Sequence, residues 1–247
     1  MVKKPARETG IKIWFVGAGP GDPELITVKG QRLVKGADVL IYAGSLVNPA
    51  LVAESGAAVK LDSWGMHLDE MVDTMVKHAT AGKKVVRLHS GDPSLYGAIV
   101  EQIEKLEKQG IAVEIIPGVS SLFAAAAALK TQLTLRGVSE SVIVTRPAGK
   151  TLESDQIEEF SRLNSTMVIF LGTEKLGQIT GKLACPPETP AAVVFHASWP
   201  DQQIVRGTVA DIAAKAKDAG IEHTALLVIG GVVGDKKVGH VQSFLYS

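Results

Sequence analysis

The chain has 247 residues, 46% of them hydrophobic and 21% charged, which is typical of a globular protein and excludes a disordered or collagen-like chain. Its 26 basic and 26 acidic residues cancel, so the composition shows no excess of positive charge that would indicate binding to nucleic acid or to an anionic membrane surface. A single cysteine, Cys185, excludes an internal disulfide and a cysteine-based metal site and suits a cytoplasmic location, and no segment approaches the length of a membrane span.

Strands and helices are expected to alternate along the first half of the chain. Short β-branched, apolar runs bounded by glycine or proline predict strands at 11–16, 38–42, 59–61, 85–89 and 113–116. Apolar residues at helical spacing predict helices at 23–35, 49–55, 68–79, from Pro93 onward, and 119–129. Uninterrupted alternation of this kind favours a mostly parallel sheet with right-handed crossovers.

Three of these strands run into a turn that contains glycine. The turns are Gly17–Pro23, Ser90–Pro93 and Pro117–Gly118, and each precedes a predicted helix. In the second turn, Asp92 stands where a helix N-cap is expected and Pro93 where the first helical residue is expected. Such turns place bare backbone and helix N-termini along one edge of the sheet, which is where open α/β sheets bind ligands.

The polar, irregular segment 130–139 predicts a domain boundary, with one α/β domain at 1–132 and a second at 133–247. In the second domain, strands are expected at 141–145, 167–171, 191–195, 203–207, 225–229 and 242–246. Helices are expected at 153–163, 174–184 and 208–219. The fold class is therefore α/β with two domains, and a cleft between two such domains is a usual place for a ligand.

The glycines of the first turn do not fit a dinucleotide site. Gly17, Gly19 and Gly21 are followed by Asp22, where the third glycine of a G-x-G-x-x-G fingerprint should stand. The second strand ends in Ile41–Gly44, without the carboxylate that would hold a ribose, and no Gly-Lys-Ser/Thr phosphate loop follows the glycines. The residues alone predict an enzyme that binds a nucleoside-like cofactor through main-chain contacts.

Signals for catalytic side chains are weak. His89, His196 and His223 lie near predicted strand ends or a turn, but their spacing does not indicate a metal site. Ser120 and Ser121 open a helix, and helix capping explains one of them. A G-x-S-x-G elbow is absent, which argues against a hydrolase nucleophile.

Taken together, the glycine blocks resemble the tetrapyrrole (corrin and sirohaem) methylase family from Ile11 to Val233. Residues 16–30, the Gly91-Asp-Pro triplet with Gly97, and residues 116–121 are similar to successive blocks of that family, in order and at its spacing. The resemblance is greatest to the branch that methylates C-11 of precorrin-4 in cobalamin biosynthesis, and it is carried by residues 42–47, 88–98 and 145–151.

The resemblance implies S-adenosylmethionine in the interdomain cleft, S-adenosylhomocysteine as its product, a homodimer, and methyl transfer to a ring carbon of a corrin-precursor tetrapyrrole. Carried over by position, the cofactor contacts would come mainly from backbone and small side chains, at Pro20, Ser90, Gly91, Asp92, Leu95, Ser120, Ser121, Leu171, Ala197 and Ala225. The tetrapyrrole would contact Gly19 and Arg146, and Lys150 and Arg206 are further basic candidates for its carboxylates.

One departure from the family pattern bears on catalysis. Uroporphyrinogen-type relatives have an Asp after the tyrosine equivalent to Tyr42, where this chain has Ala43, Gly44 and Ser45. This argues against the first methylation of the pathway and leaves no obvious proton acceptor to carry over. Asp22 and Ser45 are the candidate acceptors, although Asp22 is equally well placed to cap the helix that begins at Pro23.

The expected mechanism is positioning, because the sulfonium methyl is already activated and the electron-rich ring carbon is itself the nucleophile. Two alternatives stay open. One is a methylase of the same fold acting on another carbon, such as precorrin-2 C-20, precorrin-3 C-17 or uroporphyrinogen III. The other is a nicotinamide-binding protein or a non-catalytic binding module. The sequence does not indicate whether the tetrapyrrole holds cobalt.

Overall fold

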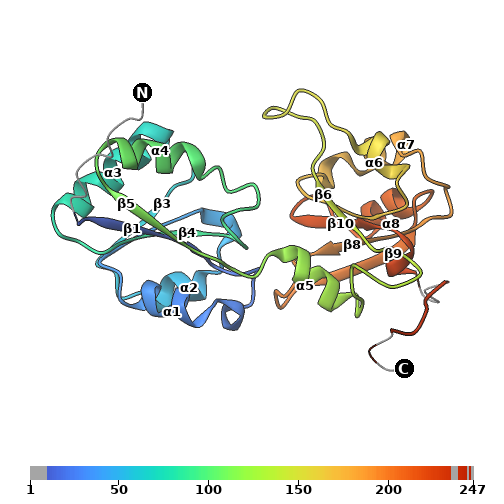
Figure 1. Ribbon diagram of the computed structural model, residues 1–247, viewed down its shortest axis with the longest axis horizontal. Coiled ribbons are helices and arrows are strands. Elements are labelled where there is room, and N and C mark those ends of the chain that lie inside the picture. Colours follow the sequence, from blue (N-terminus) through green and yellow to red (C-terminus); the bar gives the residue numbers. More distant parts are fainter. Residues whose placement is uncertain (1–9, 235–238, 244, 246–247) are drawn as a thin grey trace. The chain divides into compact units, whose positions relative to one another are not determined.

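The computed structural model describes residues 10–234, 239–243 and 245 (Figure 1). Contacts divide the chain into two compact units, Met1–Ser121 and Leu122–Ser247. The division falls after the first residue of helix α5 (Ser121–Ala128), earlier than the predicted boundary between residues 132 and 133. The reason is packing, because the apolar side chains of this helix belong to a core of the second unit.

The first unit contains a five-stranded sheet in the order β3-β2-β4-β1-β5 (Figure 1). All of its strand pairs are parallel, as the alternation of strands and helices predicted. The strands are β1 (Lys12–Gly17), β2 (Val39–Tyr42), β3 (Val59–Asp62), β4 (Val85–His89) and β5 (Ala112–Ile116). Because the strands are parallel, their carboxyl ends meet at one edge, here called the carboxyl edge of the first sheet.

Helices cover both faces of this sheet. They are α1 (Val28–Lys35), α2 (Pro49–Glu54), α3 (Leu68–Thr80) and α4 (Val100–Lys108), with short 3-10 turns η1 (Pro23–Leu25) and η2 (Gly44–Leu46). The face under α3 and α4 buries Phe15 and Met75, and the face under α1 and α2 buries Leu40 and Leu51. Alternate residues of β1, β2 and β4 therefore supply two separate cores, as expected for a sheet covered on both sides.

The helix predicted from Pro93 onward is present as α4, but its predicted start is wrong, because α4 begins only at Val100. The Asp92 carboxylate accepts a hydrogen bond from the Ser94 amide at 2.8 Å, which makes a turn. Tyr96 and Ala98 then take left-handed backbone angles, with φ of 56° and 46°, which a continuous right-handed helix cannot contain. Residues 92–98 therefore form an irregular loop at the carboxyl edge.

The start of α1 is fixed by Thr27. Its hydroxyl accepts a hydrogen bond from the Gly30 amide at 3.1 Å, which makes it the N-cap residue. We expect Thr27→Ala to lower the free energy of unfolding by about 1 kcal/mol, the usual cost of losing such a cap. Urea unfolding measures this loss. Thr74→Ala, which removes an exposed hydroxyl within α3, is the control and should cost less than about 0.5 kcal/mol.

The second unit contains a mixed sheet in the order β6-β7-β10-β8-β9. Its strands are β6 (Val142–Thr145), β7 (Thr166–Ile169), β8 (Pro190–Phe195), β9 (Gln203–Thr208) and β10 (Ala225–Ile229). Only the β6–β7 pair is parallel, and β9, where the sequence predicted a strand at 203–207, is an antiparallel edge strand. The strand predicted at 242–246 is not found at Gln242, Ser243 or Leu245, and its other positions lie outside the described residues.

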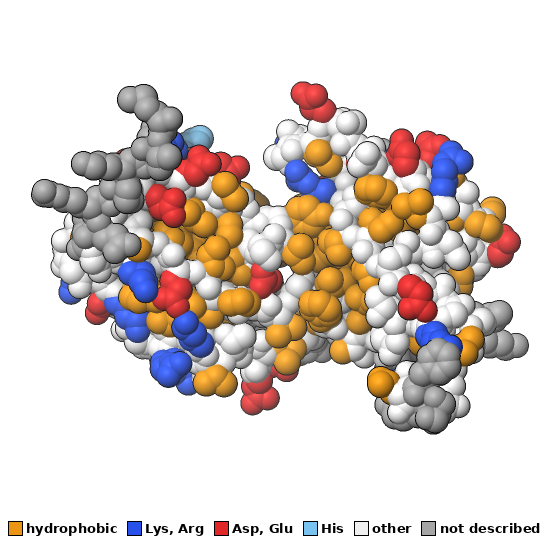
Figure 2. Space-filling view, viewed as in Figure 1, with side chains coloured by type: hydrophobic (Ala, Val, Ile, Leu, Met, Phe, Trp, Pro, Cys, Tyr) orange, Lys and Arg blue, Asp and Glu red, His pale blue; other side chains and the backbone are white. Residues whose placement is uncertain are grey.

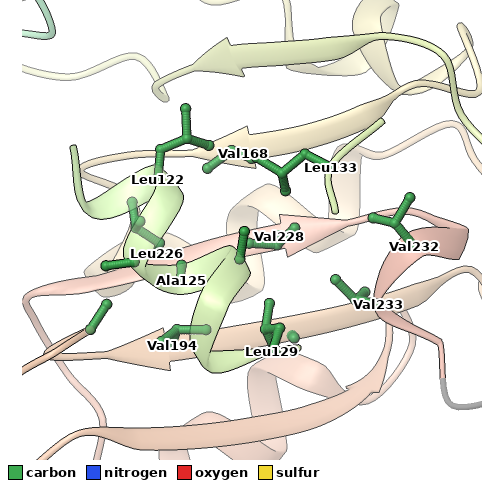
Figure 3. Close-up of a cluster of buried hydrophobic side chains, with 14 of the residues drawn as sticks. Leu122, Ala125, Leu129, Leu133, Val168, Val194, Leu226, Val228, Val232 and Val233 are labelled. Atoms are coloured by element: carbon green, nitrogen blue, oxygen red, sulfur yellow. The ribbon is translucent and has the colours of Figure 1, made fainter. Parts of the chain in front are cut away.

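Helix α5 lies across one face of this sheet (Figure 3). Leu122 and Ala125 of α5, and Leu129 directly after it, point toward Val194 and Val228 on the strands, and all five are buried. The opposite face carries α6 (Ile157–Ser161), α7 (Leu176–Lys182) and α8 (Ile212–Asp218) over a second core, and the 3-10 turns are η3 (Thr173–Lys175) and η4 (Gly231–Val233).

Acidic and basic side chains are interspersed over both units on the face drawn in Figure 2, as the zero net charge leads one to expect. Within the described residues, no helix is both long enough and apolar enough to cross a membrane.

Candidate functional site

The first two glycine turns are joined at the carboxyl edge of the first sheet. The Gly19 amide donates to the Gly91 carbonyl at 3.2 Å, and the Gly91 amide donates back to the Gly19 carbonyl at 2.8 Å. One residue earlier, the Ala18 amide donates to the His89 carbonyl at 2.7 Å. The loops after β1 and β4 are therefore joined by backbone hydrogen bonds.

The third turn approaches so closely that side chains are excluded. A Cβ atom on Gly17 would lie 2.5 Å from the Gly118 Cα, and a Cβ atom on Gly118 would collide with the Gly91 carbonyl oxygen. Only glycine permits this approach of three strand ends. The result is a patch of bare backbone at the carboxyl edge, where Gly17, Gly91 and Gly118 meet.

Asp92 fastens the second turn to the third. Its Oδ2 accepts a hydrogen bond from the Gly118 amide at 2.8 Å, and its Oδ1 accepts one from the Ser94 amide at 2.8 Å. Burial raises the pKa of the Asp92 carboxyl, but the bonds from Ser94 and Gly118 outweigh burial and hold the pKa below its usual value. Asp92 is thus an ionised residue that holds the loop in place.

The structure brings together all of the predicted cofactor residues of the first unit. They follow β1, β4 and β5, three adjacent strands, and are Pro20, Ser90, Gly91, Asp92, Leu95, Ser120 and Ser121. Gly19, predicted to contact the tetrapyrrole, lies in the same patch with φ of 82°. Gly17, Gly91 and Gly118 form what we call the glycine cradle. Its bare backbone and the small side chains around it fit a nucleoside held through main-chain contacts.

The predicted residues of the second unit share one edge of the second sheet. Arg146 follows β6, Leu171 follows β7, Ala197 follows β8, and Ala225 opens the antiparallel β10. We call this end of the sheet the Leu171 edge. The Ala225 backbone is fixed there by the Thr173 hydroxyl, which contacts both its amide and its carbonyl at 3.1 Å.

Backbone strain is concentrated at the Leu171 edge. Four non-glycine residues there have left-handed backbone angles, namely Leu171 (φ 54°), His196 (φ 45°), Ser198 (φ 73°) and Thr224 (φ 52°). Such conformations cost on the order of 1–3 kcal/mol each and cluster at functional sites. Leu171 is in addition 64% exposed despite its apolar side chain. Sequence reasoning gave no sign of this strain, because none of the four residues is glycine.

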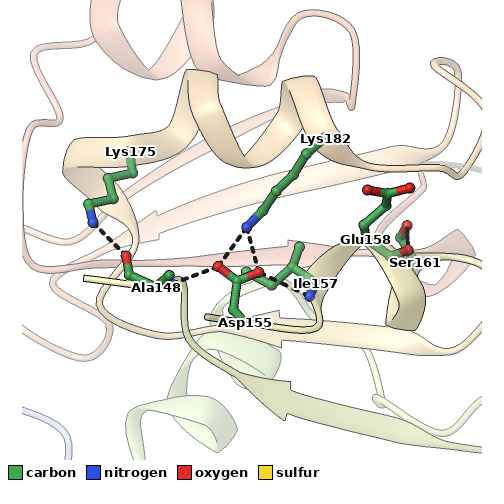
Figure 4. A network of polar contacts seen from close by, with 7 residues as sticks. All are labelled: Ala148, Asp155, Ile157, Glu158, Ser161, Lys175 and Lys182. Atoms are coloured by element: carbon green, nitrogen blue, oxygen red, sulfur yellow. Dashed lines mark hydrogen bonds and ion pairs between the residues drawn. The ribbon is translucent and has the colours of Figure 1, made fainter. Parts of the chain in front are cut away.

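Arg146 lies on a braced loop between β6 and α6. Its guanidinium donates to the Thr151 hydroxyl at 2.7 Å and to the Thr151 carbonyl at 3.1 Å. Further along the loop, Asp155 accepts hydrogen bonds from the Ala148 amide at 2.6 Å and from Lys182 of α7 (Figure 4). A loop without regular structure is thus held in one shape at the Leu171 edge.

The structure corrects the prediction that Arg206 could bind the tetrapyrrole carboxylates. Its guanidinium donates to the backbone carbonyls of Val233, at 2.7 Å, and of Leu129, at 2.9 Å, so it ties η4 to the end of α5.

The two candidate proton acceptors lie in the short 3-10 turns of the first unit or beside them. Asp22 caps η1 by accepting a hydrogen bond from the Glu24 amide at 2.9 Å, and Ser45 lies within η2. Among the described residues, no group of three or more His, Cys, Asp or Glu side chains could hold a metal ion.

His89 and Arg87 lie inside the first unit, on the α3 and α4 face of β4. Each is 5% exposed, and the His89 ring stacks on Phe15 with 5.6 Å between centroids. Burial, followed by the charge of Arg87, lowers the pKa of His89 to about 3, so His89 is neutral near pH 7. Burial also lowers the pKa of Arg87 to about 10, and the charge of Asp62 partly offsets this.

Comparison with known proteins identifies the family. The profile described as Tetrapyrrole (Corrin/Porphyrin) Methylases matches residues 12–213, which is most of the chain. The chain belongs to this family. A cobalt-precorrin-4 C(11)-methyltransferase of Methanocaldococcus jannaschii is 54% identical to this tetrapyrrole methylase over 231 residues, covering 91% of this chain and 89% of the relative.

Two solved structures resemble this tetrapyrrole methylase closely. A cobalt precorrin-4 methyltransferase, described as a cobalamin biosynthetic enzyme, is 41% identical with a TM-score of 0.88 and covers 93% of this chain and 98% of its own. A uroporphyrin-III C-methyl transferase from Thermus thermophilus, complexed with S-adenyl homocysteine, is 31% identical with a TM-score of 0.79 and covers 90% and 98%. The predicted fold class, two α/β domains of the tetrapyrrole methylase type, is confirmed.

Proposed function

We propose that this tetrapyrrole methylase uses S-adenosylmethionine to methylate C-11 of precorrin-4, or of its cobalt complex, in cobalamin biosynthesis. The observation that carries the proposal is the glycine cradle of Gly17, Gly91 and Gly118 at the carboxyl edge. It lies in a chain that is 54% identical to a relative named for this reaction. Family membership also favours a methylase over the nicotinamide-binding alternative.

The proposed cofactor contacts are the ten residues predicted from the sequence. They are Pro20, Ser90, Gly91, Asp92, Leu95, Ser120, Ser121, Leu171, Ala197 and Ala225. S-adenosylmethionine supplies a methyl group on a positively charged sulfur, and the sulfur keeps the electron pair when that methyl leaves. Most of these residues offer backbone or small side chains, so their contribution is to hold the reactants in line. In favourable intramolecular models, alignment of this kind supplies roughly 7–11 kcal/mol of the barrier reduction.

The assembly and location of the protein are also proposals. A homodimer is inferred from the family resemblance, and a cytoplasmic location from the single cysteine. Light scattering on the purified chain tests the first, since a homodimer should have twice the 26.0 kDa mass of one chain.

The decisive experiment locates the new methyl group. The protein is incubated with isotopically labelled S-adenosylmethionine and, in separate reactions, with precorrin-4 and cobalt-precorrin-4. We expect one labelled methyl on C-11, detected by mass spectrometry and NMR of the product. A label on C-20 or C-17 would assign the chain to another methylation step. Calorimetry should show binding of S-adenosylhomocysteine and no binding of NAD, and the reverse would contradict the proposal.

Arg146 tests the proposed tetrapyrrole contact. Precorrins carry several carboxylates, and a guanidinium fixed at the Leu171 edge can pair with one of them. We expect Arg146→Glu to raise the KM for the tetrapyrrole about tenfold, equivalent to about 1.4 kcal/mol, while affinity for S-adenosylhomocysteine stays the same. Arg162→Glu, at an exposed residue of the same unit, is the charge-matched control. An unchanged KM in Arg146→Glu would remove Arg146 from the substrate site.

A further inference from the structure

Asp62 presents a carboxylate at the carboxyl edge of the first sheet. It is the last residue of β3, and the register pairs it with Tyr42, the last residue of β2. Its side chain is exposed, in contrast to Arg87 on β4, which lies on the other side of β2. A charged group at the end of a parallel strand is therefore available to a ligand bound at this edge.

The orientation of this carboxylate is fixed. Its Oδ1 accepts hydrogen bonds from the Gly44 amide at 3.0 Å and from the Trp64 amide at 2.9 Å. Both bonds reach the same oxygen, which leaves Oδ2 as the atom that can take a proton. The carboxylate is thus held in place without using the oxygen that would do chemistry.

Gly44 allows the carboxylate to lie over the loop that follows β2. A Cβ atom on Gly44 would come within 2.6 Å of Asp62 Oδ2, so any other residue at position 44 would push the carboxylate aside. Asp62 consequently occupies the space that a side chain of this loop would fill. Behind it lies the buried Arg87, whose interaction with Asp62 is favourable to both charges.

We propose that Asp62 is a catalytic residue that stabilises the positive charge developing on the ring nitrogen during methylation and accepts its proton through Oδ2. This role rests on the proposed function. As the ring carbon shares its π electrons with the incoming methyl group, the adjacent nitrogen becomes cationic. The N–H bond then breaks with its electrons remaining on nitrogen, and the proton forms an O–H bond with Asp62. The cationic ring nitrogen is a stronger acid than the neutral N–H group, which favours transfer of its proton to the carboxylate.

Asp62→Asn tests the role because it removes the charge and keeps an oxygen that can accept the Gly44 and Trp64 hydrogen bonds. With metal-free precorrin-4, we expect kcat to fall at least about 100-fold, the lower range for loss of a general base. Affinity for S-adenosylhomocysteine, by calorimetry, and for the tetrapyrrole, by absorbance titration, should change less than about threefold, below about 0.7 kcal/mol. A kcat within about threefold of the wild type would overturn the proposal.

The matched control is Asp38→Asn, at the opposite end of the same strand pair. Asp38 precedes β2, and its carboxylate likewise accepts a backbone amide, that of Lys84, at 2.7 Å. Its loss should leave kcat unchanged, and an equal loss of kcat in both variants would overturn the proposal. If Asp62→Asn fails to fold, Asp62→Glu and Asp62→Gln decide, because they differ only in charge. Turnover by the Glu variant should exceed that of the Gln variant at least tenfold, and equality would overturn the role.

The two proposals fail differently. A wild-type protein that transfers no methyl group to precorrin-4 would overturn the proposed function and the role of Asp62 with it. A wild-type protein that methylates C-11, with Asp62→Asn equally active, would overturn only the role of Asp62.

Discussion

Replacing Gly118 by alanine is expected to weaken cofactor binding strongly and to destabilise the first unit. The added Cβ atom would collide with the Gly91 carbonyl oxygen and lie 2.8 Å from the Gly17 Cα. These neighbours are backbone atoms at the ends of sheet strands, so they cannot rotate away as a side chain would. Overpacking of cores costs about 1–3 kcal/mol, and a clash with fixed backbone should reach the upper end of that range.

Binding should suffer because the same collision separates the turns that form the cradle. We expect the affinity of the Gly118→Ala variant for S-adenosylhomocysteine to fall at least about 100-fold, or about 2.8 kcal/mol, as measured by calorimetry. Gly181→Ala in α7 is the control, since nothing lies within 4 Å of its Cβ position. That change should raise stability by about 0.5–1 kcal/mol. If Gly118→Ala bound S-adenosylhomocysteine normally, the cradle would not be the cofactor site.

The glycine cradle could be predicted because turn chemistry is local. Each strand is a short apolar run, and each run stops at residues that do not extend a strand. The sequence therefore locates the end of each strand and the turn that follows it. The start of the next helix was wrongly predicted at Pro93 by the same local reasoning. The Asp92 carboxylate does cap a turn, but its other oxygen binds the Gly118 amide, a partner 26 residues away. A contact at that separation cannot be read from the neighbours of Asp92.

The left-handed backbone at the Leu171 edge and the position of Asp62 could not be predicted from the sequence, because both depend on contacts between distant residues. The left-handed backbone of Leu171 and Thr224 is imposed by the structure around it, since neither residue type favours that conformation. Asp62 gains its position from its register with Tyr42 and from the missing side chain of Gly44. Both features appear only once strands far apart in sequence are paired. Substitutions that preserve local propensity can therefore still remove them.

Breaking the Asp155–Lys182 ion pair should release the loop that carries Arg146. The Asp155 side chain is 5% exposed and binds Lys182 Nζ through both oxygens, at 2.5 and 2.6 Å (Figure 4). It also accepts the Ile157 amide at 3.1 Å. Removing one partner of a fully buried pair costs about 3–5 kcal/mol. Lys182 is 35% exposed and partly screened by water, so we expect Lys182→Met to cost about 2 kcal/mol.

The second unit also offers a control for Lys182→Met and a direct measurement of the loop that carries Arg146. Arg162→Met breaks the exposed pair between Arg162 and Glu158 of α6 and should cost less than about 0.5 kcal/mol. Hydrogen exchange at the Ala148 amide, which donates to Asp155, reports on the loop directly and should accelerate only in Lys182→Met. Equal exchange in the wild type and in Lys182→Met would show that the pair does not hold the loop.

The pH dependence follows from the direction of the Asp155 shift. Burial raises the pKa of Asp155, but the hydrogen bonds from Lys182, Ala148 and Ile157 outweigh it, so the folded pKa lies below the usual value. A lowered carboxyl pKa adds stability that is fully present above the unfolded value, about 3.9, and is lost as the pH falls through the folded pKa. The stability difference between the wild type and Asp155→Asn should therefore be constant at neutral pH and shrink only below about pH 4. Urea unfolding at a series of pH values measures it, and a difference that grew on acidification would contradict the assignment.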